Sequence, residues 1–245
     1  MCIRDRLRGD EVDYTHDAVT RAIRFLHLDL GFIALDPPIP IYVAANAPRM
    51  LALVGELADG HVAMGNERPR VLARHLDAIR GGAAKAGRAL PDGFHPAALT
   101  TAVVLGPGEA VDSDRVVEQC GSQVAAGLHF AYEAWSVTRD DAVVPRAYAN
   151  VWQEYVDHGA AMRTPADRRY LEVHEGHCTY LVPAERRFVT PETIRASALV
   201  GEPDELIAQI RAAEAAGLRE IGLLPSMATA RTVLREFAER VIARY

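Results

Sequence analysis

The chain has 245 residues, of which 49% are hydrophobic and 24% charged, as in an ordinary globular protein that can bury a core. No apolar run approaches the about 18 residues that a transmembrane helix needs, so we expect no membrane partner. The net charge of −6 argues against a nucleic-acid partner, because phosphate backbones bind surfaces rich in Lys and Arg. The three widely spaced cysteines match neither a disulfide framework nor a metal site, which favours a cytoplasmic protein.

The first six residues differ in character from the rest of the chain. They read Met-Cys-Ile-Arg-Asp-Arg and have neither the apolar stretch nor the cleavage site of a signal peptide. They match a translation of the transposon end that is used to prepare sequencing libraries. We therefore expect residues 1–6 to be a sequencing-adapter artefact, with a natural N-terminus as the alternative. On this interpretation residues 7–245 are the C-terminal part of a longer barrel domain, and the chain alone is inactive.

A strand-helix-strand pattern begins after a polar segment at residues 7–17, which predicts a loop. Residues 39–45 are short, β-branched and apolar on both faces, as in a buried parallel strand. Asn46-Ala47-Pro48 then begins a helix, because proline is favoured in a first helical turn. That helix ends at Asp59-Gly60, and residues 61–65 form the next strand. Together these segments predict a right-handed βαβ unit.

The alternation continues along the chain with helix 67–87, strand 97–106, helix 111–130, helix 203–216, strand 220–225 and helix 228–245. Four strands alternating with helices predict a parallel α/β sheet, and a complete TIM barrel would need eight such units. We therefore predict a partial TIM (β/α)8 barrel that contains about strands 5–8. Residues 131–198 carry helical signals and no convincing strand, so they predict a helical insertion before the last strand.

Ligands of parallel α/β folds bind beyond the carboxyl ends of the strands. Four loops of this chain occupy such places: residues 45–48, 64–67, 106–108 and 225–227. The first loop joins small residues to a helix start, whose free N–H groups can bind a phosphate. The alternative is a plain connection in which the small residues serve close packing. Gly106-Pro107-Gly108 is not followed by Lys and Ser or Thr, so it does not match a phosphate loop.

Three segments resemble the luciferase-like monooxygenase superfamily. Residues 38–65 resemble its fifth strand, helix and sixth strand, and Glu56-Leu57-Ala58-Asp59-Gly60 fits its Ala-Asp-Gly motif. Residues 169–190 resemble one branch of the family, with His174-Glu175-Gly176-His177 in their centre. The segment that starts Gly201-Glu202-Pro203 resembles the Gly-Thr-Pro-Glu-Glu helix start, with Glu202 where Thr is usual. The resemblance spans essentially residues 7–245.

This resemblance implies a (β/α)8 barrel that binds FMN or coenzyme F420 and carries out hydride transfer or monooxygenation on a small-molecule substrate. In the family, the loop after the fifth strand helps to hold the cofactor phosphate and chain, and the loop after the sixth strand lies near the cofactor tail or the substrate. The implied cofactor-binding residues are Ala45, Asn46, Ala47, Met50, Met64, Gly65 and Asn66. Catalytic residues commonly come from the first half of the barrel, so none is assigned here.

Two further groups of residues attract functional interpretations. His174 and His177 would share one helix face, but a zincin needs histidines at i and i+4 and a third ligand, so we predict no metal site and a packing or substrate-lining role. Trp135, Tyr148, Trp152 and Tyr155 have roughly helical spacing, which favours a core or a homodimer stripe over a cofactor site.

Two other functions stay open. A barrel lyase or isomerase acting on a phosphorylated metabolite would need a Lys or paired carboxylates at strand ends, and Lys85 lies on a predicted helix. A non-catalytic flavin-binding relative would bind the cofactor tightly without substrate-dependent oxidation.

Overall fold

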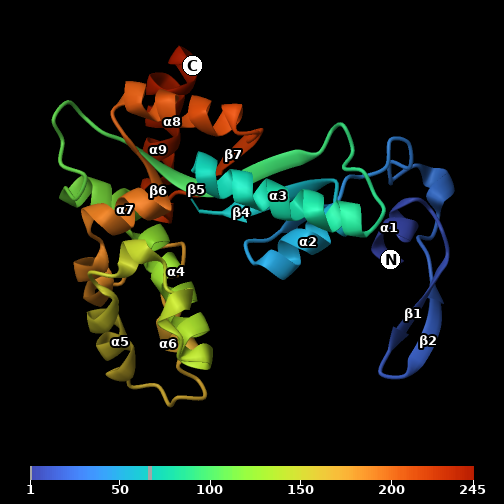
Figure 1. Ribbon diagram of the computed structural model, residues 1–245, viewed down its shortest axis with the longest axis horizontal. Coiled ribbons are helices and arrows are strands. Elements are labelled where there is room, and N and C mark those ends of the chain that lie inside the picture. The colour runs from blue at the N-terminus through green and yellow to red at the C-terminus, as the bar shows by residue number, and fades with distance from the viewer. Residues whose placement is uncertain (1, 66–67) are drawn as a thin grey trace. The chain divides into compact units, whose positions relative to one another are not determined.

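The computed structural model describes residues 2–65 and 68–245 of the chain. These residues form two compact units (Figure 1). Unit 1 comprises the chain up to His61 together with Ala78–Phe94, and unit 2 comprises Val62–Asp77 and His95–Tyr245. Among the described residues, no helix has the length and apolar character needed to cross a bilayer.

Unit 1 begins with helix α1 (Cys2–Leu7) and an antiparallel hairpin of β1 (Val12–His16) and β2 (Val19–Ile23). The loop predicted at residues 7–17 is therefore wrong. Nearly all residues of the two strands are exposed, so no apolar face marks them in the sequence. The turn between them places both Asp17 and Ala18 at positive φ (48° and 61°), which suits the twist of a two-residue hairpin.

The βαβ pattern predicted for residues 39–65 is confirmed. Strand β3 (Tyr42–Ala44) precedes helix α2 (Pro48–Leu57), and strand β4 (Gly60–Met64) follows and continues into unit 2. Helix α3 (Pro69–Lys85) begins in unit 2 and ends in unit 1.

Helices α2 and α3 approach each other closely at two glycines of unit 1. A Cβ atom on Gly55 of α2 would lie 1.8 Å from the carbonyl oxygen of Ile79, and one on Gly82 of α3 would lie 2.1 Å from that of Ala52. No side chain fits at either position while the two backbones stay this close.

Unit 2 is built on the long strand β5 (His95–Val104). Its first half pairs in parallel with β7 (Glu220–Leu223), and its second half pairs in parallel with β6 (Ala198–Gly201). The four predicted strands and the parallel α/β class are thereby confirmed, whereas the half-barrel remains a prediction. Strand β6 was not predicted from the sequence, because it has only four residues and follows helix α7 (Pro191–Ser197) without a turn signal.

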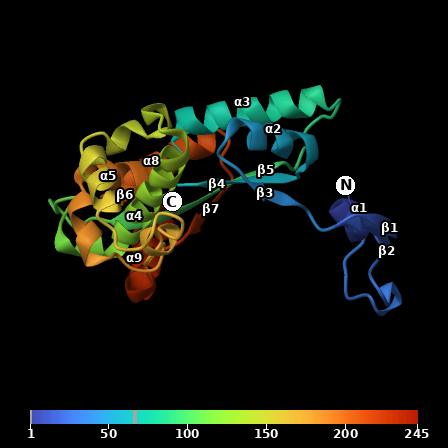
Figure 2. The same ribbon diagram turned by 90° about the horizontal axis from the view of Figure 1, so that it is seen from below.

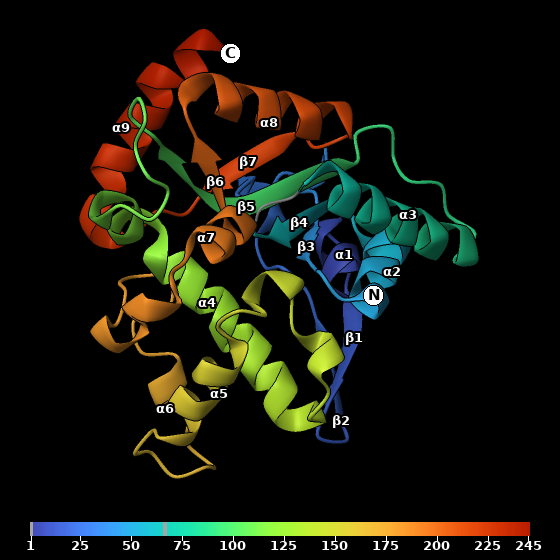
Figure 3. The same cartoon turned by 60° about the vertical axis from the view of Figure 1, so that its left-hand side comes forward.

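Helices cover both faces of this sheet (Figure 3). Val104 packs with residues of α8 (Pro203–Ala215) and α9 (Ala230–Arg240). Its neighbour Val103 packs with residues of α4 (Asp114–Thr138) and α7. Successive side chains of a strand point to opposite faces, so two adjacent valines serve two separate helical layers.

The predicted insertion at residues 131–198 is largely helical. It contains the end of α4, then α5 (Trp152–Ala160), α6 (Tyr170–Val173), short 3-10 turns and α7. Figure 2 shows α5 beside α4. Tyr148 and Tyr155 are buried in the aromatic cluster between these helices, and Trp135 and Trp152 pack against it. The prediction that this stripe forms a core is confirmed.

Candidate functional site

The loop that follows β3 in unit 1 and the first turn of α2 together contain four of the predicted cofactor-binding residues, and we call this segment, residues 45–50, the Ala45–Met50 loop. Ala45 is buried, whereas Asn46 and Ala47 are exposed and Met50 is 41% exposed. Ala47 is the N-cap of α2 and makes no side-chain cap, and Pro48 has no N–H group. The N–H groups of Arg49 and Met50 therefore point out of the first helical turn without an intrahelical acceptor, at the positive end of the helix dipole.

His61 fixes the start of this loop. Its side chain is fully buried in unit 1, and its Nε2 atom lies 2.7 Å from the carbonyl oxygen of Ala45. Because a carbonyl oxygen only accepts, Nε2 carries the proton and donates it. Sequence reasoning did not select His61, although it is the one ionisable residue in the short segment Gly60–Met64.

Asp59 explains the Ala-Asp-Gly motif at the end of α2. One carboxylate oxygen accepts hydrogen bonds at 3.0 Å from the backbone N–H of Ile41 and from the side chain of Arg4. The other oxygen lies 3.4 Å from Arg88, whose guanidinium also donates to the carbonyl of Gly55. Asp59 thus joins Ile41, which directly precedes β3, to the end of α2. The two elements that flank the Ala45–Met50 loop are thereby held together.

The remaining predicted residues follow β4. Met64 is 38% exposed, and Gly65 adopts φ +104°, a conformation that favours glycine. The N–H of Gly65 donates to the carbonyl oxygen of Leu99 at 2.9 Å, so this turn is held to β5 within unit 2. Asn66 lies outside the described residues. The structure thus groups Ala45, Asn46, Ala47 and Met50 on one loop, and Met64 with Gly65 on another.

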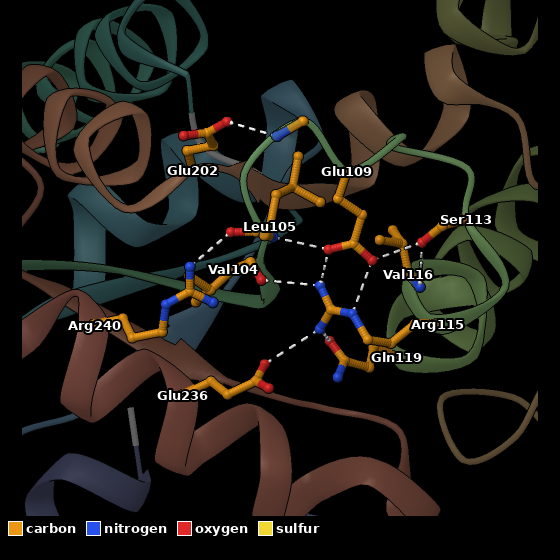
Figure 4. Close-up of polar contacts among 12 residues, drawn as sticks. Val104, Leu105, Glu109, Ser113, Arg115, Val116, Gln119, Glu202, Glu236 and Arg240 are labelled. Carbon is orange, nitrogen blue, oxygen red and sulfur yellow. Dashed lines mark hydrogen bonds and ion pairs between the residues drawn. The ribbon is translucent and has the colours of Figure 1, made fainter.

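Two carboxylates accept hydrogen bonds from backbone N–H groups of the loop after β5 (Figure 4). Glu109 accepts hydrogen bonds from the N–H of Gly106 at 2.8 Å, from Ser113 at 2.9 Å and from both Nε and an amino group of Arg115. A second acidic side chain, Glu202, accepts from the N–H of Gly108 at 3.3 Å. The backbone donors of this glycine loop are thereby occupied by carboxylates, which a phosphate would have to displace.

Arg115 is the centre of the same network. Besides Glu109, its guanidinium contacts Glu236 at 3.3 Å, Gln119 at 3.2 Å and the carbonyl oxygen of Val104 at 3.0 Å. The hydrogen bond from Arg115 is the main reason that the pKa of Glu109 is lowered to about 2. These contacts join the end of β5 to α4 and α9 and give the loop a structural role.

The loop after β7 also faces inward. Ser226 is 3% exposed, and its hydroxyl lies 2.6 Å from that of Ser122 on α4. The hydroxyl also lies 3.3 Å from the carbonyl oxygen of Gln119. Ser226 therefore joins the end of β7 to α4. In the Ala45–Met50 loop, by contrast, the N–H groups of Arg49 and Met50 have no intrahelical acceptor.

Comparisons with known proteins agree with this architecture. The model of the luciferase-like monooxygenase family matches residues 2–220. A phthiodiolone/phenolphthiodiolone dimycocerosates ketoreductase of Mycobacterium tuberculosis is 36% identical over 98 residues, which cover 39% of this chain and 24% of that protein.

Solved structures show the same fold at low sequence identity. The coenzyme F420-dependent tetrahydromethanopterin reductase from Methanopyrus kandleri has a TM-score of 0.54 and 18% identity, and the match covers 99% of this chain and 60% of that one. An F420-dependent secondary alcohol dehydrogenase has a TM-score of 0.52 and 18% identity, with 98% and 58% covered. The chain thus spans less than two thirds of each relative. Because the family model matches from residue 2 to residue 220, the chain belongs to the luciferase-like monooxygenase family.

Proposed function

We propose that this chain belongs to an oxidoreductase that uses FMN or coenzyme F420, and that the start of α2 binds the phosphate of that coenzyme. The observation that carries the proposal is the loop from Ala45 to Met50, which follows a strand and leads into an uncapped helix start. Family membership supports the coenzyme class, because relatives with this fold include F420-dependent enzymes.

The residues of the loop fit a phosphate. Ala47 is exposed and carries only a methyl group, so the backbone at the start of α2 is accessible to a ligand. The N–H groups of Arg49 and Met50, at the positive end of a ten-residue helix, favour a bound anion. The half-exposed side chain of Met50 offers an apolar, flexible surface beside them.

Bound FMN or F420 supplies the capacity for hydride transfer, and reduced FMN also reacts with dioxygen. The part of this chain is to bind and orient: the start of α2 holds the phosphate, and His61 holds the loop through the carbonyl of Ala45. The 98-residue similarity to a ketoreductase supports hydride transfer to a carbonyl group as the reaction, with monooxygenation as the alternative. Roles for Met64, Gly65 and Asn66 near the coenzyme tail or the substrate stay predictions.

Titration of the purified chain with coenzymes tests this proposal. FMN is compared with riboflavin, and F420 is compared with its deazaflavin core without the phosphate chain, by following coenzyme fluorescence. We expect FMN or F420 to bind about tenfold or more tightly than its phosphate-free form, a difference of about 1.4 kcal/mol, because the helix start recognises the phosphate. The coenzyme that gives the lower Kd identifies the class.

Equal affinities for the phosphorylated and phosphate-free forms would contradict a phosphate site. Absence of binding by all four compounds up to about 1 mM, a binding energy of only about 4 kcal/mol, would contradict the coenzyme role of the chain. Tight binding without substrate-dependent oxidation of the reduced coenzyme would favour a non-catalytic binding protein.

A further inference from the structure

Three histidines of unit 2 converge at one point. His129 lies on α4, and His174 and His177 lie in the segment that follows α6. The Nδ1 atom of His177 is 2.9 Å from Nδ1 of His129 and 3.0 Å from Nδ1 of His174. Ligand nitrogens of all three rings lie within 4.8 Å of one another.

The outer nitrogens of two of these rings face carboxylates. Nε2 of His129 lies 2.9 Å from Oε1 of Glu185, and Nε2 of His174 lies 2.9 Å from Oε1 of Glu133. A carboxylate only accepts hydrogen bonds, so each Nε2 carries a proton. In the neutral rings the Nδ1 atoms of His129 and His174 then hold lone pairs, and both point at Nδ1 of His177.

Protons satisfy this arrangement poorly. A proton on Nδ1 of His177 can be donated to only one of the two lone pairs. Protons on Nδ1 of both His129 and His174 would make two imidazolium rings side by side, both aimed at one nitrogen, at a cost in charge repulsion. A single cation between the rings accepts all three lone pairs at once.

We propose that His129, His174 and His177 bind one Zn²⁺ ion through their Nδ1 atoms, with the fourth tetrahedral position left for water or another ligand. Zn–N bonds of about 2.0–2.1 Å place tetrahedral nitrogens about 3.3 Å apart. The two separations from Nδ1 of His177 need to widen by only a few tenths of an ångström, and the ligand nitrogens of His129 and His174, which lie within 4.8 Å of each other, need to reach the same spacing. Three imidazoles are a donor set that Zn²⁺ favours.

The surroundings of the rings have the form of an outer ligand shell. Carboxylates that accept from the second nitrogen of a ligating histidine fix its tautomer and orientation, and Glu185 and Glu133 occupy these places. Glu185 is 3% exposed and also accepts from the hydroxyl of Tyr155 at 3.0 Å. Its second oxygen, Oε2, is buried and has no hydrogen-bond partner among the described residues. A cation bound to His129 would help to hold this buried negative charge.

Burial and accessibility also suit a metal ligand set. The side chain of His129 is 1% exposed, whereas that of His174 is 28% exposed, so an ion can enter from one side. Burial, together with repulsion from His129 and His174, lowers the pKa of His177. A lowered pKa favours the neutral ring, which is the form that binds a metal ion.

The proposal departs from the expectation that His174 and His177 only pack or line a substrate site. Their spacing lacks a third ligand in the sequence nearby, and that ligand comes from α4, far upstream in the chain. The pairing becomes visible only when the insertion folds back on α4.

Metal binding by the purified chain, stripped with a chelator, tests the proposal. Co²⁺ is titrated as a spectroscopic substitute, and Zn²⁺ is titrated in competition with a chromophoric chelator. The variants are His174→Gln, His177→Gln and the outer-shell variant Glu133→Gln. His95→Gln is the matched control, because the His95 side chain is 27% exposed and lies 2.9 Å from a carboxylate of Glu220, outside the cluster.

We expect the wild-type chain and H95Q to bind one Co²⁺ per chain with the visible absorption of a tetrahedral ion, and to bind Zn²⁺ with the same stoichiometry. H174Q and H177Q should weaken binding by about 100-fold or more, and E133Q by about tenfold. At a hundredfold excess over Kd, Zn²⁺ should raise the Tm of the wild-type chain by about 5–10 °C and that of H177Q hardly at all. Circular dichroism of the metal-free variants checks that they are folded.

Two results would overturn the proposal. One is a wild-type chain that binds less than one equivalent of Co²⁺ and Zn²⁺ at about 1 mM, well above any Kd of a built site. The other is binding by H174Q, H177Q and E133Q that equals that of H95Q. Either result would mean that the three histidines are joined only by hydrogen bonds and bind no metal ion.

Discussion

Single side chains hold the loops that follow the strands of this protein, and Glu109 holds the loop after β5. Its carboxylate accepts from Gly106, Ser113 and Arg115, and the Arg115 hydrogen bond is the main cause of its low pKa of about 2. Because the folded-state pKa lies below the ordinary value of 4.5, the ionised form is the stabilising one. Its contribution is complete above pH about 4.5 and is lost as the pH falls toward about 2.

Replacing Glu109 by Gln should lower the free energy of unfolding by about 1–3 kcal/mol near neutral pH, because charge-assisted hydrogen bonds to Arg115 are lost. The difference from wild type should shrink as the pH falls from about 4.5 toward about 2, because Glu109 of the unfolded chain binds a proton in this range while Glu109 of the folded chain stays ionised. Urea unfolding at several pH values measures it. The control Glu236→Gln removes one contact of 3.3 Å and should cost less than about 1 kcal/mol. A deficit for E109Q that is independent of pH would be inconsistent with this explanation.

His61 acts on the candidate site through the backbone. His61→Leu removes the donor to the carbonyl of Ala45, so we expect the Kd for FMN or F420 to rise about three- to tenfold and the free energy of unfolding to fall by about 1–3 kcal/mol. Fluorescence titration and urea unfolding measure the two effects separately. The exposed His16 of the hairpin supplies the control His16→Gln, which should change neither. Lower stability with an unchanged Kd would show that His61 supports the fold without positioning the loop.

At the scale of elements, the contact between α2 and α3 depends on the absence of two side chains. Gly55→Ala and Gly82→Ala would each place a methyl group against a backbone carbonyl, and we expect each to cost about 3 kcal/mol through displacement of the helices. Gly81→Ala is a matched control on the same helix, because a Cβ there meets nothing within 4 Å. It should stabilise by about 0.5–1 kcal/mol, since alanine favours helix. Thermal unfolding of the three variants measures these changes in stability. Equal changes for Gly81→Ala and Gly82→Ala would refute the close-contact explanation.

The elements that sequence patterns predicted are those with a buried apolar face. The strands at residues 39–45, 61–65, 97–106 and 220–225 were found because their apolar side chains form short uninterrupted runs. The β1–β2 hairpin was missed because its side chains are exposed and carry no such run. Strand β6 was missed because it is short and directly follows a helix, so pairing with β5 rather than local sequence creates it.

Local sequence patterns also predicted only part of the candidate site. The Ala45–Met50 loop was predictable because strand, small residues and helix-starting proline adjoin in sequence. His61 and His129 were not, because each acquires its role through a partner distant along the chain. The signal that marks both in hindsight is a histidine with apolar neighbours along the chain: His61 precedes residues 62–64, which are all apolar, and His129 lies between Leu128 and Phe130.

At the scale of the whole molecule, membership of the luciferase-like monooxygenase family and a parallel α/β sheet direct attention to the loops beyond the strand ends. Homodimer formation stays a prediction, and the aromatic stripe gives it little support, because Tyr148 and Tyr155 are buried within the insertion. The function proposed for this molecule depends on the binding of the coenzyme phosphate at the start of α2.

The most direct test is the coenzyme Kd of Ala47→Glu. A carboxylate at the N-cap of α2 would repel the phosphate while leaving the helix stable, since a negative charge at this position is compatible with the helix dipole. We expect the Kd for FMN or F420 to rise about tenfold or more, or about 1.4 kcal/mol, with an unchanged Tm. The control Ala84→Glu, at an exposed position of α3, should bind as wild type does. Wild-type affinity in A47E would contradict phosphate binding at the start of α2.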